Sequence, residues 1–308
     1  MILNTGSRTD IPAFFGEWME NRMREGVVLV RSPFYPAQVT RYRIDPDTVD
    51  LLAFCTKNPA PFLRRMDCLS PFRQMWFVTL TPYGTDMEPN VPPAEAVIEA
   101  FRELSRRVGL RGMSWRYDPV FLTERYTEAF HREAFERMAA ALDGFTDQVV
   151  VSFIDLYEKT KRNFPEARPV SVPEQERLTA SFVGSARRHG MTVRLCGAAY
   201  ALSRFGADVS GCFSREVAER AAGYSLDPPR TKGARPACSC LLGNDIGAYN
   251  TCPHLCRYCY ANFDREAVCR NLARHDPASP FLVGGPEDGD VVTEAKQTSW
   301  REAQLRMF

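Results

Sequence analysis

Three cysteines close to the C-terminal end have the spacing of a metal-binding loop. Cys252, Cys256 and Cys259 lie in the run Thr-Cys-Pro-His-Leu-Cys-Arg-Tyr-Cys-Tyr-Ala-Asn, which is Cys-x3-Cys-x2-Cys with an aromatic residue before the last cysteine. Thiolates are suitable ligands for iron–sulfur clusters and for zinc, and a four-iron cluster ordinarily takes four of them. Three thiolates would leave one iron open for chemistry. The spacing therefore predicts a 4Fe–4S cluster bound by these three residues.

The alternative of zinc fits the spacing less well. Structural zinc sites usually show paired Cys-x-x-Cys knuckles, and only Cys256 and Cys259 form one here. The pair Cys238 and Cys240 is too closely spaced for such a knuckle. This pair is still a candidate metal or redox site, and three roles remain open. It supplies a fourth cluster ligand, forms a redox-active dithiol, or binds a second metal together with Cys196, Cys212 or Cys269.

Composition limits the class of protein. The 308 residues include ten cysteines and carry a formal net charge of +1. There is no apolar run long enough to span a membrane and no secretory start, so we expect a cytoplasmic protein that does not bind membranes. Cysteines in that compartment are metal ligands, catalytic groups or packed thiols rather than a disulfide framework. A charge near zero gives no global attraction for nucleic acid.

The elements that position the cysteines alternate between apolar strands and amphipathic helices. We predict strands at 2–5, 49–55, 75–81, 113–117, 149–154 and 192–196, a shorter one at 207–211, and a hairpin of 27–31 with 39–44. Predicted helices are 12–25, 93–108, 127–142, 173–189 and 264–272. This order predicts parallel strands with right-handed crossovers. We expect an α/β fold, a TIM-like (β/α) barrel, complete or incomplete, over residues 1–224. Residues 225–308 would form a linker, a cysteine-rich cluster-binding extension and a terminal helix that packs on the barrel.

Polar residues follow most of the predicted strands. Barrel active sites form at the carboxyl ends of the strands, so these residues predict a pocket for a small polar substrate. Arg8 and Lys57 would bind a carboxylate or phosphate through charge-assisted hydrogen bonds. Taken one at a time, these residues could also be helix caps and turn formers. The candidate catalytic or substrate-binding residues are Arg8, Asp10, Thr56, Lys57, Thr79, Thr81, Arg116, Asp118, Ser152, Asp155 and Tyr157.

The whole chain resembles a conserved bacterial family described as a domain of unknown function. The matching landmarks are 8–14, 56–59, 79–84, 115–119, 152–157, 238–240, 245–247, 252–262 and 296–300. The cysteine cluster of that family is similar to the N-terminal cluster of the radical S-adenosylmethionine (SAM) enzymes. The ending Cys-Tyr-Ala-Asn is also similar, more distantly, to spore photoproduct lyase-like radical SAM proteins. The resemblance implies a 4Fe–4S cluster, SAM as a second cofactor, and Tyr258 and Asn262 beside it.

The position of the cysteines departs from the radical SAM pattern. Those enzymes carry the loop after the first barrel strand, whereas here it follows all the strands. Either the loop folds back over the barrel mouth, or its site never binds SAM. The leading hypothesis is a radical-SAM-like enzyme that takes electrons from a reductant such as flavodoxin or ferredoxin. The alternatives are an electron carrier or redox sensor without SAM, and, less favoured, a nucleic-acid repair lyase that uses Arg230, Lys232 and Arg235.

Overall fold

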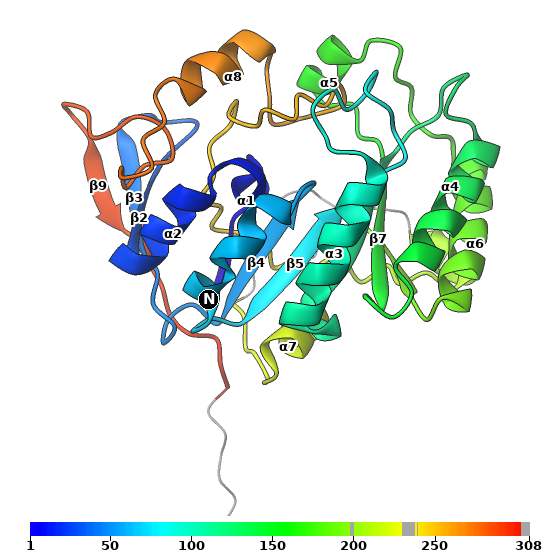
Figure 1. Cartoon of the computed structure of the whole chain (residues 1–308), viewed down its shortest axis with the longest axis horizontal. Helices are drawn as coiled ribbons and strands as arrows, with labels where there is room; N and C mark the ends of the chain where they lie inside the picture. Colours follow the sequence, from blue (N-terminus) through cyan, green and yellow to red (C-terminus); the bar gives the residue numbers. More distant parts are fainter. Residues whose placement is uncertain (198–199, 230–237, 239, 303–308) are drawn as a thin grey trace, which may run out of the picture.

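The protein is built on one six-stranded parallel sheet (Figure 1). The computed structural model describes residues 1–197, 200–229, 238 and 240–302. The strands of this sheet are mostly apolar and buried, as expected for a parallel sheet that is covered on both faces. The strands, in their order across the sheet, are β1 (Ile2–Asn4), β4 (Leu51–Thr56), β5 (Gln74–Thr79), β6 (Met113–Val120), β7 (Gln148–Phe153) and β8 (Thr192–Leu195).

The six main predicted strands are confirmed, but the sheet is open. Within the described residues no pairing joins β8 to β1, so there is no closed barrel. The seventh predicted strand, 207–211, is reduced to a single parallel bridge between Asp208 and Arg194. The chain is therefore an α/β protein with a parallel sheet, compatible with an incomplete barrel.

Helices cover the outer face of the sheet, as Figure 1 shows. Side chains at alternate strand positions, such as Phe54 and Trp76, point into this helical layer. These two rings stack with centroids 4.0 Å apart. The helical segments of the chain are α1 (Ile11–Phe14), α2 (Gly16–Glu25), η1 (Ala60–Leu69), α3 (Ala94–Val108), η2 (Leu110–Gly112), α4 (Glu128–Ala141), α5 (Glu158–Asn163), α6 (Val172–Arg188), η3 (Tyr200–Phe205), α7 (Arg215–Ala222) and α8 (Arg265–Leu272).

A second apolar layer fills the inner face of the sheet. The intervening strand residues, including Ala53, Met75 and Phe77, pack against Phe213 and α7. Phe213 meets Phe77 edge to face, with ring centroids 5.4 Å apart. We call Phe213 and α7 the inner plug. The plug occupies the side of the sheet that would face the axis of a closed barrel.

A small separate sheet lies at one edge of the molecule. The predicted hairpin is confirmed as β2 (Val27–Arg31) paired antiparallel with β3 (Gln38–Arg43). A third strand, β9 (Val291–Glu294), pairs parallel with β3. The expected terminal helix is thus wrong for residues 291–302, where the β-branched run Val-Val-Thr favours a strand. Residues 303–308 lie outside the described part.

The predicted first helix, 12–25, is interrupted. α1 ends at Phe14 and α2 begins at Gly16, because Phe15 between them leaves the helical conformation (φ −124°, ψ 31°). Asp10 caps α1 by accepting a hydrogen bond from the backbone N–H of Ala13 at 3.1 Å. The cap fixes the Asp10 carboxylate at the carboxyl end of β1.

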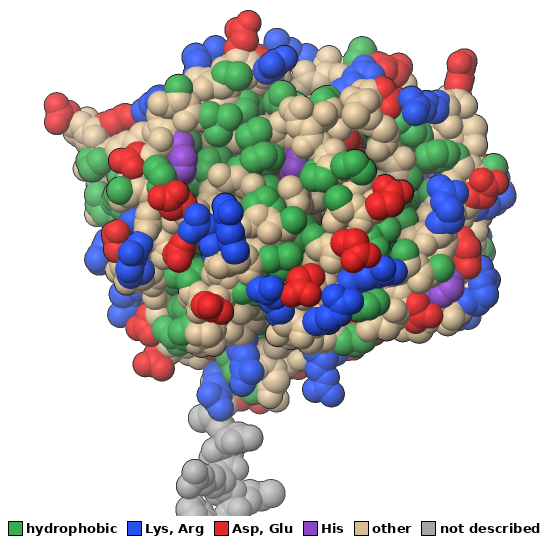
Figure 2. Space-filling model, in the orientation of Figure 1, with side chains coloured by type: hydrophobic (Ala, Val, Ile, Leu, Met, Phe, Trp, Pro, Cys, Tyr) green, Lys and Arg blue, Asp and Glu red, His purple; other side chains and the backbone are tan. Residues whose placement is uncertain are grey.

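The surface is mixed in charge. In Figure 2 basic and acidic side chains are interspersed over the visible face, without a broad area of one sign. This distribution agrees with the net charge of +1. No helix in the described residues has the length and apolarity that a bilayer crossing requires.

Candidate metal centre and substrate site

The segment that leads into the cysteine loop lies beside β1. Asn4 and Asp245 form a parallel bridge, and the Ile246 N–H donates to the Asn4 carbonyl at 2.9 Å. In Figure 1 the gold chain that follows this bridge runs over the upper end of the sheet toward α5. The loop that follows all strands in the sequence therefore reaches the carboxyl end of the first strand.

The turn after β1 is fastened to this segment by polar contacts. The Ser7 N–H donates to the Asp245 carboxylate at 2.6 Å, and Arg8 donates to the carbonyls of Asp245 and Gly247, each at 3.4 Å. The Tyr260 hydroxyl donates to the Ser7 carbonyl at 2.6 Å. Arg8 is thus held against the cysteine segment.

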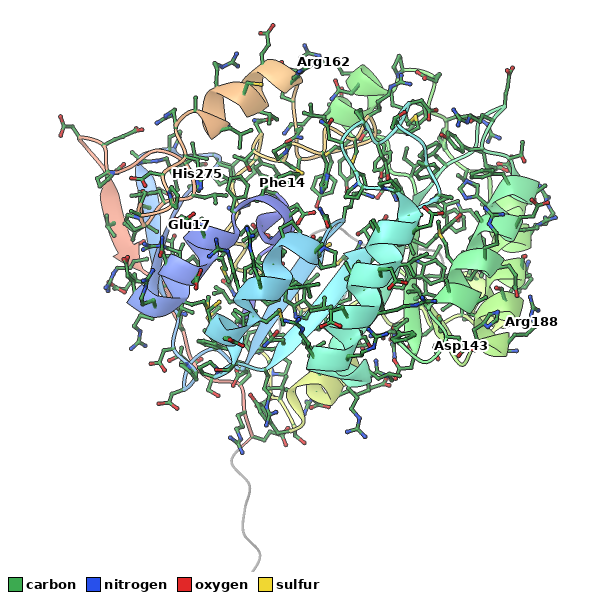
Figure 3. All side chains as sticks on the ribbon, in the orientation of Figure 1. Phe14, Glu17, Asp143, Arg162, Arg188 and His275 are labelled. Carbon is green, nitrogen blue, oxygen red and sulfur yellow. The ribbon has the colours of Figure 1, made fainter. Side chains whose placement is uncertain are left out.

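Asp10 links three parts of the chain. Besides capping α1, its carboxylate accepts from the Lys57 N–H at 2.7 Å and lies 3.0 Å from Nε2 of His254. Nδ1 of His254 lies 3.1 Å from the Asn90 carbonyl oxygen, and Phe14, labelled in Figure 3, packs edge-on against the ring. Both ring nitrogens of His254 face oxygen atoms. In this conformation the histidine fastens the loop and is not free to bind metal.

A buried network joins the ends of β4 and β5 to the cysteine loop. Lys57 Nζ donates to Thr81 at 3.2 Å and to Glu88 at 2.9 Å, while the Thr81 hydroxyl donates to Glu88 at 2.6 Å. The Tyr258 hydroxyl donates to the same carboxylate oxygen. Burial lowers the pKa of Lys57, but Glu88 and Cys256 raise it above its ordinary value overall. The network holds a positive charge next to Cys256.

All three thiols of the loop have a raised pKa. Burial raises the pKa of Cys252, Cys256 and Cys259, while Lys57 opposes this at Cys256, and Lys159 and Lys57 oppose it at Cys259. Within the described part of the chain, no three His, Cys, Asp or Glu side chains meet in a way suited to a single metal ion. Cluster ligands need not converge in this way, because each thiolate binds a different iron. The donor set, three thiols of one loop, is compatible with such a cluster.

Two buried polar atoms near the loop have no hydrogen-bond partner in the described structure. Asn262 donates through Nδ2 to the Cys252 carbonyl at 2.8 Å, but its Oδ1 has no partner. The Thr9 hydroxyl, in the turn after β1, is similarly unsatisfied. Buried polar atoms without partners are uncommon and suit a bound group. Asn262, predicted beside a cofactor, thus has an acceptor available.

The Tyr249 ring has two cations near it, Arg8 and Lys159, which sequence reasoning did not bring together. Lys159 Nζ is 4.9 Å and the Arg8 guanidinium carbon 5.6 Å from the centroid of its ring. Burial lowers the pKa of Lys159, and Cys259 opposes that effect. Lys159 also donates to the Ala261 carbonyl at 3.3 Å. Arg162 of α5, labelled in Figure 3, covers the Phe263 ring at 4.0 Å and helps to hold the end of the loop.

Of the predicted strand-end residues, Arg8, Asp10, Lys57 and Thr81 contact the cysteine segment or its network. Arg116 and Asp118 form an ion pair, and Thr79 lies beside the Cys55 thiol. The ring of Tyr157 lies 5.7 Å from that of Tyr260.

Three other predicted residues have local contacts. Thr56 accepts from the Asn58 N–H at 3.0 Å, and Ser152 turns to the Phe153 carbonyl. Asp155 is exposed, and its carbonyl accepts from Tyr157. These contacts do not place the three residues in the network around the cysteine loop.

Cys240, a member of the second predicted cysteine pair, contacts cysteines other than those of the loop triad. Cys240 Sγ lies 2.8 Å from Cys212 Sγ, and both thiols also contact Cys196. The contact with Cys196 raises the pKa of Cys240 to about 12. Cys238 is half-buried, with residues 230–237 and 239 around it outside the described part. Arg230, Lys232 and Arg235, the basic residues of the nucleic-acid alternative, also fall outside it.

Comparison with protein families gives a match over most of the chain. A model of the family described as "Domain of unknown function (DUF1848)" matches residues 2–261, which include the whole parallel sheet and the cysteine loop through Cys259. No curated protein and no solved structure matches the chain.

Proposed function

The chain belongs to the DUF1848 family, and we propose that it is an iron–sulfur enzyme of the radical SAM type that acts on a polar substrate. The observation that supports this proposal is the position of the cysteine loop. Although the loop follows every strand of the main sheet, it lies against the carboxyl ends of β1, β4 and β5, through Ser7, Asp10 and the Lys57 network. Parallel α/β proteins form their sites at that edge.

Cys252, Cys256 and Cys259 would hold the cluster. When bound, it would supply a low-potential electron and, with three protein ligands, an open iron for SAM. Lys57 and Lys159 stabilise negative charge on the sulfurs, since each lowers the pKa of a neighbouring thiol. Because the three thiols must lose protons to bind iron, cluster loading should become more favourable as pH rises.

The chain offers polar groups for the organic part of the site. The unsatisfied Oδ1 of Asn262 can accept a hydrogen bond from an amino group. Arg8 and Lys159, both near the Tyr249 ring, supply positive charge for a carboxylate or phosphate. Tyr258 is buried and is fixed by its hydrogen bond to Glu88. These features favour a substrate or cofactor with an anionic group.

The test begins with anaerobic reconstitution with iron and sulfide. We expect about four irons per chain, and an electron paramagnetic resonance signal on reduction that changes when SAM is added. Dithionite and SAM should then yield 5′-deoxyadenosine. Cys256→Ser should lose the cluster, whereas Cys269→Ser, an exposed thiol on α8, should retain it. A cluster that loads and reduces but leaves SAM intact would exclude the SAM step, and tetrahedral zinc in its place would exclude the enzyme proposal.

The electron-carrier alternative requires a fourth protein ligand. Of the two candidates, Cys238 and Cys240, the latter contacts Cys212 and Cys196 in this structure, which disfavours Cys240 as that ligand. Under the proposal, Cys240→Ser retains the loop cluster and its response to SAM. Loss of the cluster in that variant would favour the electron carrier instead.

A further inference from the structure

Three cysteines outside the loop triad meet at one place in the fold. Cys196 directly follows β8, Cys212 precedes the inner plug, and Cys240 lies on the segment that leads to the cysteine loop. The sulfur atoms of Cys212 and Cys240 are 2.8 Å apart, and Cys196 is within hydrogen-bonding reach of both. Three thiols from distant parts of the sequence are therefore in mutual contact.

Backbone contacts hold these thiols in position. The Leu241 N–H donates to the Phe213 carbonyl at 3.0 Å, so the two cysteines that precede these residues project from neighbouring backbone. The Cys196 N–H donates to the Val151 carbonyl at 2.9 Å and is fixed to the edge of β7. The contact between the sulfurs thus follows from the sheet and the inner plug rather than from surface side chains.

Access to the three thiols is unequal. Cys212 is 3% and Cys196 8% exposed, whereas Cys240 is only partly buried. A reagent from solution would therefore meet Cys240 first. Cys196 and Cys212 are placed to react only after Cys240 has reacted with the reagent, by attacking the Cys240 sulfur.

We propose that Cys212 and Cys240 form a reversible disulfide by exchange with a small-molecule disulfide, with Cys196 as a third exchanging thiol. A disulfide bond is about 2.05 Å long, so the observed 2.8 Å contact requires a small approach of the two sulfurs.

The exchange takes two steps, over which electrons and protons balance. The Cys240 thiolate attacks one sulfur of R–S–S–R, breaks that bond and releases one thiol, leaving a mixed disulfide on Cys240. The Cys212 thiolate then attacks the Cys240 sulfur and releases the second thiol. Two cysteines lose two electrons and two protons, and one R–S–S–R becomes two R–SH. Because the pKa of Cys240 is raised to about 12, few molecules carry the thiolate and exchange should take minutes to hours.

The bond would tie the cluster-bearing segment to the sheet. Cys240 precedes Asp245 by five residues, and Asp245 bridges to β1 and accepts from Ser7. The disulfide would restrain this segment upstream of the loop. Since the three thiols differ from the loop triad, the bond should form with or without a bound cluster.

The test maps cysteine linkage after equilibration in glutathione buffers of rising oxidised fraction. Free thiols are alkylated, the protein is digested, and linked peptides are identified by mass spectrometry. We expect a Cys212–Cys240 linked peptide that disappears on reduction. In Cys212→Ser, the mixed disulfide on Cys240 should persist or pass to Cys196. In Cys269→Ser, the linked peptide should form as in the natural chain.

Two results would overturn the proposal. One is complete alkylation of both Cys212 and Cys240 at the most oxidising glutathione ratio. The other is a tightly bound metal that Cys212→Ser loses while the loop cluster remains, which would make this a second metal site. Linkage in the unsubstituted protein decides the question even if a variant fails to fold. This readout is independent of SAM cleavage, so its failure is distinct from failure of the proposed function.

Discussion

At the scale of single residues, Glu88 is the group that sequence reasoning missed. Its neighbours in the network, Lys57, Thr81 and Tyr258, were identified because they follow strands or lie in the cysteine motif. Glu88 lies in the run Met-Glu-Pro-Asn, nine residues after Thr79 ends β5, where the sequence resembles an ordinary surface turn. Only the fold shows that this carboxylate is 3% exposed and serves three donors.

Glu88→Gln should destabilise the protein. The substitution leaves Lys57 buried without its counter-ion, and removing one partner of a buried pair costs about 3–5 kcal/mol. Urea unfolding of the metal-free protein measures the effect. Lys57→Met combined with Glu88→Gln should cost less than the sum of the two single changes, because the two residues are coupled. Glu103→Gln, which breaks exposed pairs with Arg106 and Arg107, should have a much smaller effect. Equal effects of the two Glu→Gln changes would contradict the network.

At the scale of elements, prediction succeeded where the signal was long and local. The runs that became β4, β5 and β7 are mainly apolar, so their burial follows from composition. α7 is eight residues long, and its role comes from packing on the inner face, which no local pattern encodes. β9 has four exposed residues and forms because β3 offers a free edge. Both were missed because their partners lie far away in the sequence.

The inner plug predicts a specific cost for losing one ring. Phe213 is fully buried against Phe77, so Phe213→Ala should lower the free energy of unfolding by about 3–5 kcal/mol through the cavity it leaves. Phe34→Ala, at a ring that is 82% exposed in the β2–β3 turn, should change stability by no more than about 0.5 kcal/mol. Chemical denaturation of both variants provides the comparison. A small loss at Phe213 would mean that the plug does not stabilise the sheet.

At the scale of the whole molecule, the sequence predicted the parallel sheet but not whether it closes. The sheet would close into a barrel only if β8 paired with β1. The inner plug and residues 244–246 occupy the space that this pairing would need. The latter lie along the free side of β1, where a barrel would require β8. The α/β class was therefore predictable from the alternation of strands and helices, whereas the open edge of the sheet was not.

Global stability should depend on pH through His131. This fully buried ring donates from Nε2 to the Phe121 carbonyl and accepts at Nδ1 from Tyr117. Burial lowers its pKa from 6.5 to about 4, although the bond to Phe121 opposes this. The unfolded chain therefore binds a proton that the folded chain does not. The resulting stability is complete above pH 6.5 and is lost as pH falls toward 4, by about 3 kcal/mol in all.

Denaturant unfolding at several pH values between 7.5 and 4 measures this contribution. His131→Gln keeps a donor and an acceptor but does not titrate, so the natural protein should lose about 3 kcal/mol more than the variant over this range. Parallel pH profiles would show that His131 does not carry the effect.

The bridge between Asn4 and Asp245 has a consequence for synthesis. A ribosome produces β1 some 240 residues before the segment that becomes its second neighbour. Until then, one side of β1 presents unpaired backbone groups, and an exposed strand edge can recruit another chain. Nascent chains that stall before the cysteine segment emerges should therefore aggregate through β1, and completion of translation should protect that edge.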